Sequence, residues 1–248
     1  MGIKHTILGI DASNLGVGYT PLKPSGLKFI NFFGGTASPA KNLYGADGQV
    51  VGSPVPKGMA VGLQCDSSNK VKTSVKHSTQ MTVFGVFSAP ADASRAYCIT
   101  DYTDGRPIGM AVYLEPNGSG GYRLNAAHGY SDSAGANIAM ARPTEVIEKN
   151  RLIAFAATFD TSVTGTLKIS LTNLTLNTTT NGVNSTTVTG LPSNTADLYV
   201  GASLETTLTN ISCVAMGAIW QRILTPAEIT EQYNQIKSYY QKVHGVII

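Results

Sequence analysis

The most regular pattern of hydrophobic and polar positions lies near the end of the chain. From Cys213 to Trp220 every position is apolar or small, which predicts a strand covered on both faces. Thr225, Pro226 and Glu228 then have the spacing of an N-cap, a first-turn proline and the acidic partner of a capping box. The apolar residues that follow at helical spacing are Ile229, Tyr233, Ile236 and Tyr240. This pattern predicts a buried strand that leads directly into one packed helix.

Shorter strand patterns occupy most of the preceding chain. Thr79–Phe87 and Asn150–Phe159 are apolar on both faces and predict central strands, whereas Thr166–Leu171 alternates and predicts one exposed face. Gly129–Ala134 is polar and predicts a turn. Further strands are expected at Ile7–Ile10, Lys28–Phe33, Met59–Leu63, Arg95–Tyr102, Gly109–Glu115, Tyr122–Ala126, Ala136–Ala141 and Asp197–Gly201. Together these elements predict an all-β fold, a two-sheet antiparallel jelly-roll β-sandwich with one C-terminal helix.

Composition agrees with this class and suggests how the chain is divided. Charged residues make up 13% of the 248 residues, against about 25% in an average soluble domain. Five of the eleven prolines fall within the irregular first part of the chain. We therefore expect residues 1–69 to form an extended lead-in that wraps on the sandwich or contacts a partner, and residues 70–248 to form the sandwich.

Charge and cysteine usage exclude several classes of function. The net charge of +3 is spread out, and no Lys/Arg cluster with interleaved aromatics predicts nucleic-acid binding. The odd number of cysteines (Cys65, Cys98 and Cys213) predicts buried free thiols in a reducing compartment. We expect no signal peptide and no membrane insertion, because no segment approaches the run of about 20 apolar residues that a membrane span needs.

Four pieces of the chain, in a fixed order, resemble the laminin-G-like branch of the concanavalin A-like jelly rolls, over about residues 70–240. The pieces are Thr79–Phe87, Arg151–Asp160 with Gly165–Ser170, Leu198–Gly201 and Ala218–Ile229. The family's closing pattern is matched by Arg222, Leu224, Thr225, Glu228 and Ile229. Two features depart from it: Lys149-Asn150 stands where the family often has an aromatic pair, and Thr161–Gly165 lengthens a short turn.

The resemblance implies a non-enzymatic, adhesive or carbohydrate-recognising module, since many relatives are of that kind. The lead-in, with Asn-Leu-Tyr-Gly at 42–45 and Val-Val-Gly-Ser-Pro at 50–54, is similar to tail or other virion proteins of tailed bacteriophages. This implies a virion component assembled in the host cytoplasm, bound to itself as a homo-oligomer or to other virion proteins, and contacting cell-surface glycans. A purely structural virion protein and a glycan hydrolase with an unfamiliar acid pair stay open as alternatives.

Enzymatic motifs are missing from the chain. Hydrolases on this fold place acidic residues two apart on one strand, so that both face the same groove. None of the six glutamates has that spacing, and Glu228 already belongs to the capping box. Gly-x-Ser-x-Gly, His-Glu-x-x-His and Cys-x-x-Cys are also absent. We therefore predict that the protein is not an enzyme.

Sugar recognition requires exposed aromatic faces beside groups that hydrogen-bond hydroxyls. The segment 113–137 and the neighbouring strand have that mixture of residues. The predicted carbohydrate-binding residues are Tyr97, Tyr102, Tyr113, Tyr122, Arg123, Asn125, His128, Tyr130 and Asp132. The same tyrosines also fit a role in capping the sandwich or filling an oligomer interface.

A structural calcium ion is implied by the family resemblance. Laminin-G-like domains often hold calcium at the rim of the sandwich with hard oxygen ligands. The candidate ligands here are Asp101 and Asp104, which flank a turn between two strands. An Asp-Gly turn in which the carboxylate bonds its own backbone also accounts for these residues. We expect no other cofactor.

Overall fold

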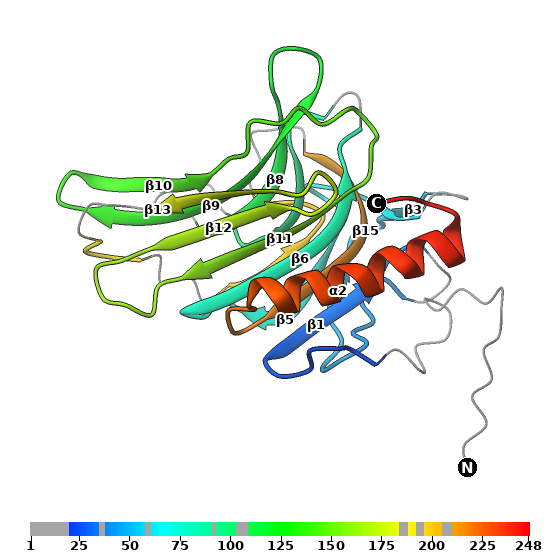
Figure 1. Cartoon of the computed structure of the whole chain (residues 1–248), viewed down its shortest axis with the longest axis horizontal. Helices are drawn as coiled ribbons and strands as arrows, with labels where there is room; N and C mark the ends of the chain where they lie inside the picture. The colour runs from blue at the N-terminus through cyan, green and yellow to red at the C-terminus, as the bar shows by residue number, and fades with distance from the viewer. Residues whose placement is uncertain are drawn as a thin grey trace.

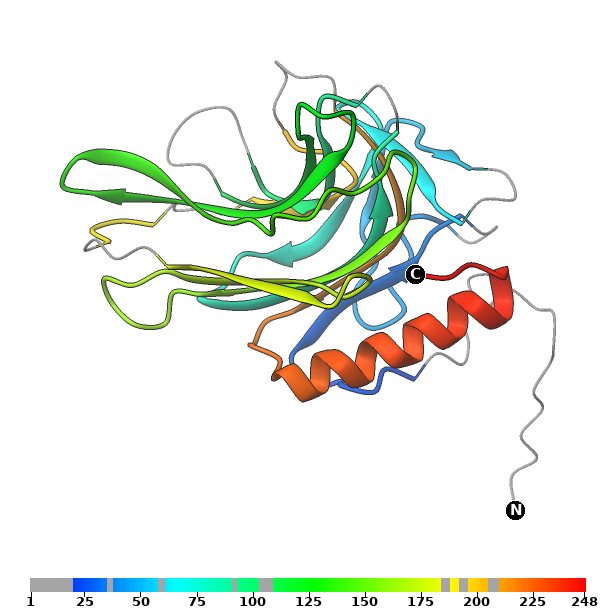
Figure 2. The same ribbon diagram turned by 45° about the horizontal axis from the view of Figure 1, so that its top comes forward.

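The computed structural model describes residues 20–34, 38–57, 61–90, 93–102, 109–183, 188–191, 196–204 and 210–248. In these ranges the chain forms two antiparallel sheets that face each other, with a helix packed on the outer side of one of them (Figures 1 and 2). The predicted all-β sandwich with a C-terminal helix is confirmed. Within this part of the chain, no helix is long and apolar enough to cross a membrane.

The eight-stranded sheet has the order β13-β12-β11-β6-β15-β4-β3, and β1 also pairs with β15. β15 pairs with β4 through its first half and with β1 through its second half. The strands are β1 (Leu27–Phe32), β3 (Val55–Pro56), β4 (Leu63–Asp66), β6 (Gln80–Ser88), β11 (Ile153–Asp160), β12 (Lys168–Asn173), β13 (Thr178–Val183) and β15 (Ile211–Trp220).

The seven-stranded sheet has the order β10-β9-β8-β7-β14-β5-β2. Its central strands β7, β8 and β9 pair in sequence, and β14 joins them to β5 near the other edge. The strands are β2 (Gln49–Val51), β5 (Lys70–Lys76), β7 (Ala96–Thr100), β8 (Met110–Pro116), β9 (Tyr122–Asp132), β10 (Gly135–Ala141) and β14 (Asp197–Val200).

The turn predicted at Gly129–Ala134 is shorter than expected, with only Ser133 and Ala134 in it. β9 continues to Asp132, because Ser131 and Asp132 pair with Ala136 and Gly135 across a hairpin whose turn contains only two residues. Gly135 has φ +117°, a conformation that glycine adopts readily and that lets the chain reverse at once. The polar side chains of this stretch belong to a hairpin and not to a loop.

The described part of the lead-in, from residue 20, lies on the sandwich. It supplies β1, β3 and β4 to the eight-stranded sheet and β2 to the seven-stranded sheet. Of the strand expected at Met59–Leu63, only Leu63 lies in a strand, at the start of β4, and residues 58–60 lie outside the described ranges. The strand expected at Ile7–Ile10 also lies outside them. Lys70–Lys76, for which we expected no strand, forms β5.

Two hydrophobic cores lie on either side of the eight-stranded sheet. Val83, Phe87 and Ile219 belong to the core between the sheets. Phe84 and Trp220 belong to the core under the helix. β6 and β15 therefore bury both faces, as their unbroken apolar patterns predict. The three cysteines are free thiols, with Cys65 and Cys98 buried and Cys213 half-buried.

Helix α2 (Pro226–Tyr239) begins at the predicted capping box. Thr225 accepts a hydrogen bond from the Glu228 amide, and the Glu228 carboxylate accepts one from the Thr225 amide. Arg222 donates two hydrogen bonds to the same carboxylate, at 2.9 and 2.8 Å. The helix ends in a π-helical turn at Tyr240–His244. Ile229, Ile236 and Tyr240 are buried against the eight-stranded sheet.

Glu228→Gln is expected to lower the free energy of unfolding by roughly 1–2 kcal/mol at pH 7, because it removes the charge from both the cap and the Arg222 pair. These hydrogen bonds, those from Arg222 first, lower the pKa of Glu228 to about 2. The stabilisation is therefore present above the unfolded-state pKa of about 4.3 and is lost as pH falls toward 2.

Urea unfolding at pH 7 and pH 3 measures this contribution. Glu231→Gln is the matched control, since Glu231 lies on the same helix and makes only an exposed ion pair with Lys23. It should cost less than about 0.5 kcal/mol. Equal losses for the two variants at pH 7 would show that the cap does not stabilise the fold.

Candidate functional site

Strand alternation divides the predicted carbohydrate-binding residues between the two faces of the seven-stranded sheet. Tyr122 and Tyr130 of β9 face the core between the sheets. Tyr97 of β7 and Tyr113 of β8 belong to a separate cluster on the opposite face. Because successive side chains of a strand point to opposite faces, a contiguous segment cannot place them together. The predicted residues therefore do not form one site.

The inward-facing tyrosines have no exposed ring face. Tyr122 is buried, and its hydroxyl lies within hydrogen-bonding distance of the Pro90 and Ala93 carbonyls, at 2.6 and 3.0 Å. Tyr130 is also buried. We expected these two rings to be exposed for stacking, but both are buried, because they pack in the hydrophobic core between the sheets.

The outward-facing tyrosines are also largely covered. Tyr97 is 0% exposed, and its ring centroid lies 5.3 Å from that of Tyr113. The Arg95 guanidinium lies over the Tyr113 ring, 5.4 Å from its centroid. Burial raises the pKa of the Tyr113 hydroxyl. Tyr102 is half-buried, with its ring 6.1 Å from that of Tyr97. The exposed faces expected of Tyr97 and Tyr113 are likewise not observed.

The polar residues of the predicted set are held by the sheet. Asn125 is buried and accepts a hydrogen bond from Arg142, which also pairs with Glu115 at 2.6 Å. Arg123 lies opposite Glu115 across β8 and β9 and is half-buried. Asp132 accepts a hydrogen bond from the Ala134 amide in the hairpin turn. These interactions organise the sheet surface and its hairpin.

His128 belongs to a buried hydrogen-bonded chain with His77 and Asp101. Its Nδ1 lies 2.6 Å from the Gly129 carbonyl, so this nitrogen carries the proton, and its Nε2 lies 3.1 Å from His77 Nε2. Desolvation first, and the neighbouring His77 second, lower the pKa of His128 to about 4. His77 Nδ1 lies 3.2 Å from the buried Asp101 carboxylate. His128 is therefore a neutral, buried group and not a surface hydrogen-bonding residue.

The calcium hypothesis stays a prediction. Asp101 is buried, and its Oδ1 accepts a hydrogen bond from the Met110 amide at 2.5 Å. Asp104 lies outside the described residues. Among the residues that the structure describes, no group of three or more His, Cys, Asp or Glu side chains is placed to hold a metal ion.

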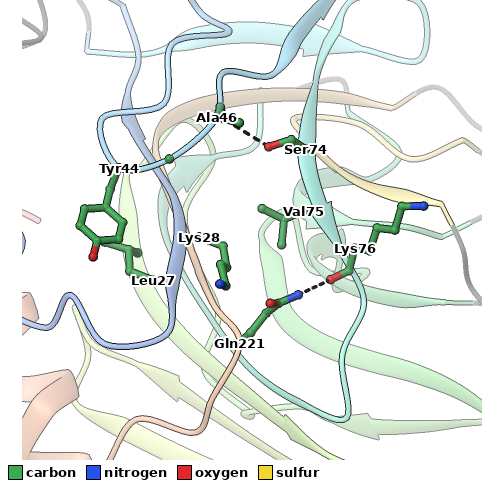
Figure 3. A pocket seen from close by; sticks show the side chains of 9 residues that line it. Leu27, Lys28, Tyr44, Ala46, Ser74, Val75, Lys76 and Gln221 are labelled. Atoms are coloured by element: carbon green, nitrogen blue, oxygen red, sulfur yellow. Dashed lines mark hydrogen bonds between the residues drawn. The ribbon is translucent and has the colours of Figure 1, made fainter.

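A groove of about 510 Å³ opens between β1 of one sheet and β5 of the other (Figure 3). Buried Leu27 and Val75 supply apolar surface to it. Ser74 donates a hydrogen bond to the Ala46 carbonyl, at 3.1 Å. The residues that line the groove are Leu27, Lys28, Tyr44, Gly45, Ala46, Ser74, Val75, Lys76 and Gln221.

Tyr44 is the exposed aromatic residue of this groove. Its side chain is 39% exposed and lies at one rim, with Lys76 at the opposite rim (Figure 3). Gln221 donates from Nε2 to the Lys76 carbonyl, at 3.1 Å, which fixes the amide between them. The groove therefore combines the exposed Tyr44 ring, the Ser74 hydroxyl, the Gln221 amide and the ammonium group of Lys28.

Asn42 holds the loop that carries Tyr44. This buried side chain accepts from the Ile30 and Tyr44 amides, both at 3.0 Å, and donates to the Lys28 and Ala46 carbonyls, at 2.8 and 3.0 Å. All four hydrogen-bonding positions of the amide are therefore occupied. At Gly45, with φ +125°, a Cβ atom would lie 3.0 Å from the Lys28 carbonyl oxygen. The loop is thus packed closely on β1.

We did not predict this groove from the sequence, because its walls come from segments near residues 27, 45, 75 and 221. The local signal was the Asn-Leu-Tyr-Gly motif at 42–45. Asn and Gly around an aromatic residue are typical of a turn that displays that residue. The motif predicts the turn, but it does not predict the hydrogen bonds of Asn42, whose partners lie up to 14 positions away along the chain.

Comparison with known proteins identifies a shared fold. No protein-family model matches the chain, and no curated protein matches it in sequence. A solved structure of Trypanosoma rangeli sialidase in complex with sialic acid superposes with TM-score 0.56 and 13% identity, over 86% of this chain and 33% of the sialidase. The binding domain of botulinum neurotoxin serotype C1 superposes with TM-score 0.55 and 10% identity, over 85% of this chain and 52% of the toxin domain.

A third structure, the binding domain of botulinum neurotoxin DC in complex with SialylT, gives TM-score 0.53 and 9% identity, over 86% of this chain and 52% of that domain. This likeness is one of fold. The chain spans about half the length of these toxin domains and a third of the sialidase. The superposition therefore covers only part of each of these structures.

Asn42→Ala is expected to lower the free energy of unfolding by roughly 2–3 kcal/mol, because it removes the side-chain partner of the Ile30 and Tyr44 amides and of the Lys28 carbonyl. Urea unfolding measures this loss. The control is Asn117→Ala, whose side chain accepts from the Ser119 and Gly121 amides in a largely exposed loop. Water can replace those bonds, so the control should cost less than about 1 kcal/mol. Similar losses at both sites would contradict a special role for Asn42.

His128 is expected to make the protein less stable as pH falls from about 6.5, its unfolded-state pKa, to about 4. The unfolded chain binds the proton first in this window, so folding loses up to roughly 3 kcal/mol. Urea unfolding between pH 7.5 and pH 4 tests this, with pH values chosen around the two pKa values. His128→Gln should flatten the dependence, whereas the control His244→Gln should keep it. Parallel curves for wild type and His128→Gln would refute the assignment.

Proposed function

We propose that the protein is a non-enzymatic carbohydrate-recognising module that binds glycans in the groove between β1 and β5. The observation that carries the proposal is the exposed Tyr44 ring, which shares this groove with the polar side chains of Ser74, Gln221 and Lys28. A sugar ring presents an apolar face that stacks on an aromatic ring and hydroxyls that hydrogen-bond in its plane. A volume of about 510 Å³ lies within the usual range of ligand pockets.

The fold of the solved structures supports the same proposal. Two of them, the sialidase and a toxin binding domain, are described with sialic acid and with SialylT bound. Binding without cleavage is supported by the lining of the groove, which contains no Asp or Glu among its described residues. Glycoside hydrolysis ordinarily uses two carboxyl groups that flank the scissile bond. We therefore propose binding, not hydrolysis, as the role of this groove.

The location remains part of the proposal. We propose that the module belongs to a bacteriophage virion and contacts host-surface glycans there, together with other virion proteins or further copies of itself. This rests on the resemblance of the lead-in around residues 42–54 to virion proteins. A purely structural virion protein would bury Tyr44 against a neighbouring subunit and would bind no glycan, so a binding experiment separates the two roles.

Tyr44→Ala is expected to weaken glycan binding at least about tenfold, which corresponds to about 1.4 kcal/mol of lost stacking. It should leave the melting temperature nearly unchanged, because the ring is largely on the surface. A glycan array identifies ligands of the wild type, and calorimetric titration then gives Kd for each variant.

Tyr102→Ala is the matched control, since Tyr102 is a half-buried tyrosine of the originally predicted set on another part of the sandwich. Its variant should keep wild-type affinity. Loss of binding in the Tyr102 variant alone would move the site to the outer face of the seven-stranded sheet. An array with no bound glycan would remove the proposed function.

A further inference from the structure

We propose that the groove takes a sugar that carries a carboxylate, and that the Lys28 ammonium group holds that carboxylate. This inference rests on the proposed function and names the chemical class of its ligand. The lining of the groove contains two lysines, Lys28 and Lys76, and no acidic residue. Such a groove favours an anionic ligand, because nothing on its walls neutralises the ammonium charge.

An irregularity in β1 leaves Lys28 exposed at the groove. The pairing of β1 with β15 shifts register between Leu27 and Phe29, and Leu27 packs in the core under the helix whereas Phe29 packs in the core between the sheets. Lys28 lies between these two buried neighbours and is itself exposed, so its side chain projects away from both cores. Figure 3 shows its ammonium group extending toward the side chain of Gln221. Lys76 lines the same groove, but its ammonium group points away from it (Figure 3). Of the two cations, Lys28 is the one directed at a bound ligand.

Neither lysine of the groove has an ion pair within the described part of the chain, so Lys28 is distinguished from Lys76 by its direction. Other basic side chains are already matched with acids: Lys23 with Glu231, Lys41 with Asp47, Lys72 with Asp197 and Arg222 with Glu228.

Asp47 lies on the same loop as Tyr44 and is the acid that could compete for Lys28. Its carboxylate instead accepts from the Asn42 amide at 2.9 Å and contacts Lys41 at 3.4 Å. The Asn42 amide, as the largest cause, lowers the pKa of Asp47 and keeps the carboxylate charged in that position. The charge of Lys28 is therefore available to a ligand.

The other groove residues complete the recognition of an acidic sugar. The Nε2 atom of Gln221 is committed to the Lys76 carbonyl, and Figure 3 shows Oε1 on the side facing Lys28. This oxygen is placed to accept a hydrogen bond from a sugar hydroxyl beside the carboxylate. An ammonium group offers three rotatable donors and so accepts a carboxylate without a fixed planar geometry. Tyr44 supplies the stacking surface.

The experiment compares acidic glycans with neutral counterparts of the same backbone. The probes are sialyllactose and a hyaluronan oligosaccharide, each compared with its own carboxyl-reduced form and titrated calorimetrically into the full chain. The wild type should bind at least one acidic probe about tenfold more tightly than its neutral partner, and this preference should shrink as salt rises from about 0.05 M to about 0.5 M.

Lys28→Met should remove this preference, weakening the acidic probe about tenfold and leaving the neutral probe unchanged. Lys76→Met is the matched control, because it removes the same charge from the same groove at a side chain directed elsewhere. It should stay within about twofold of wild type. Melting temperatures confirm that both variants are folded, as expected for exposed side chains.

Three outcomes would overturn the inference. Equal binding of acidic and neutral probes would reject an acidic ligand while leaving the proposed function in place. Equal losses in the Lys28 and Lys76 variants would indicate diffuse attraction and not a contact at Lys28. Absence of binding to every glycan would reject the proposed function as well, so the two failures can be told apart.

Discussion

Burial of β15 on both faces is the constraint on which the rest of the structure depends. Ile219 packs into the core between the sheets, and Ala218 and Trp220 pack under helix α2. A bulge between Val214 and Met216 shifts the register, and beyond it β15 exchanges β4 for β1 as its second partner. β15 therefore contacts both cores and pairs with three strands, β1, β4 and β6. The positions of the helix, of β1 and of Gln221 all depend on it.

The groove is a consequence of that arrangement. β1 is paired to β15 from Leu27 to Phe32, and the chain leaves β15 at Gln221, so two walls of the groove come from one pairing. The third wall is β5 in the opposite sheet, to which β15 does not bond directly. Asn42 then fastens the loop with Tyr44 to β1 through two hydrogen bonds and holds the loop itself through two more. The candidate ligand-binding side chains are thus carried by rigid elements, which keeps the cost of ordering them on binding low.

Burial also separates the aromatic residues around 113–137 from Tyr44. Rings such as Tyr97 and Tyr122 are covered by the protein itself, and the His77–His128 pair is enclosed with the Asp101 carboxylate. A covered ring cannot stack on a sugar unless the fold opens, which would forfeit its packing energy. Tyr44 keeps its face in solvent because a loop, and not a strand, carries it.

The sequence by itself determined the features that depend on neighbours a few residues apart. The double-faced strand β6, the alternation of β12 and the Thr225–Glu228 capping box follow from spacings of two to four positions, and all three are confirmed. The tertiary structure alone decided which face of each strand is covered and which distant segments meet. Alternation assigns side chains to two faces without showing what packs on either face. Tyr122 therefore lies in the core between the sheets, whereas Tyr113 lies on the opposite face of its sheet. The hydrogen bonds of Asn42 and the walls of the groove join segments as far apart as Lys28 and Gln221, and no local period records such contacts.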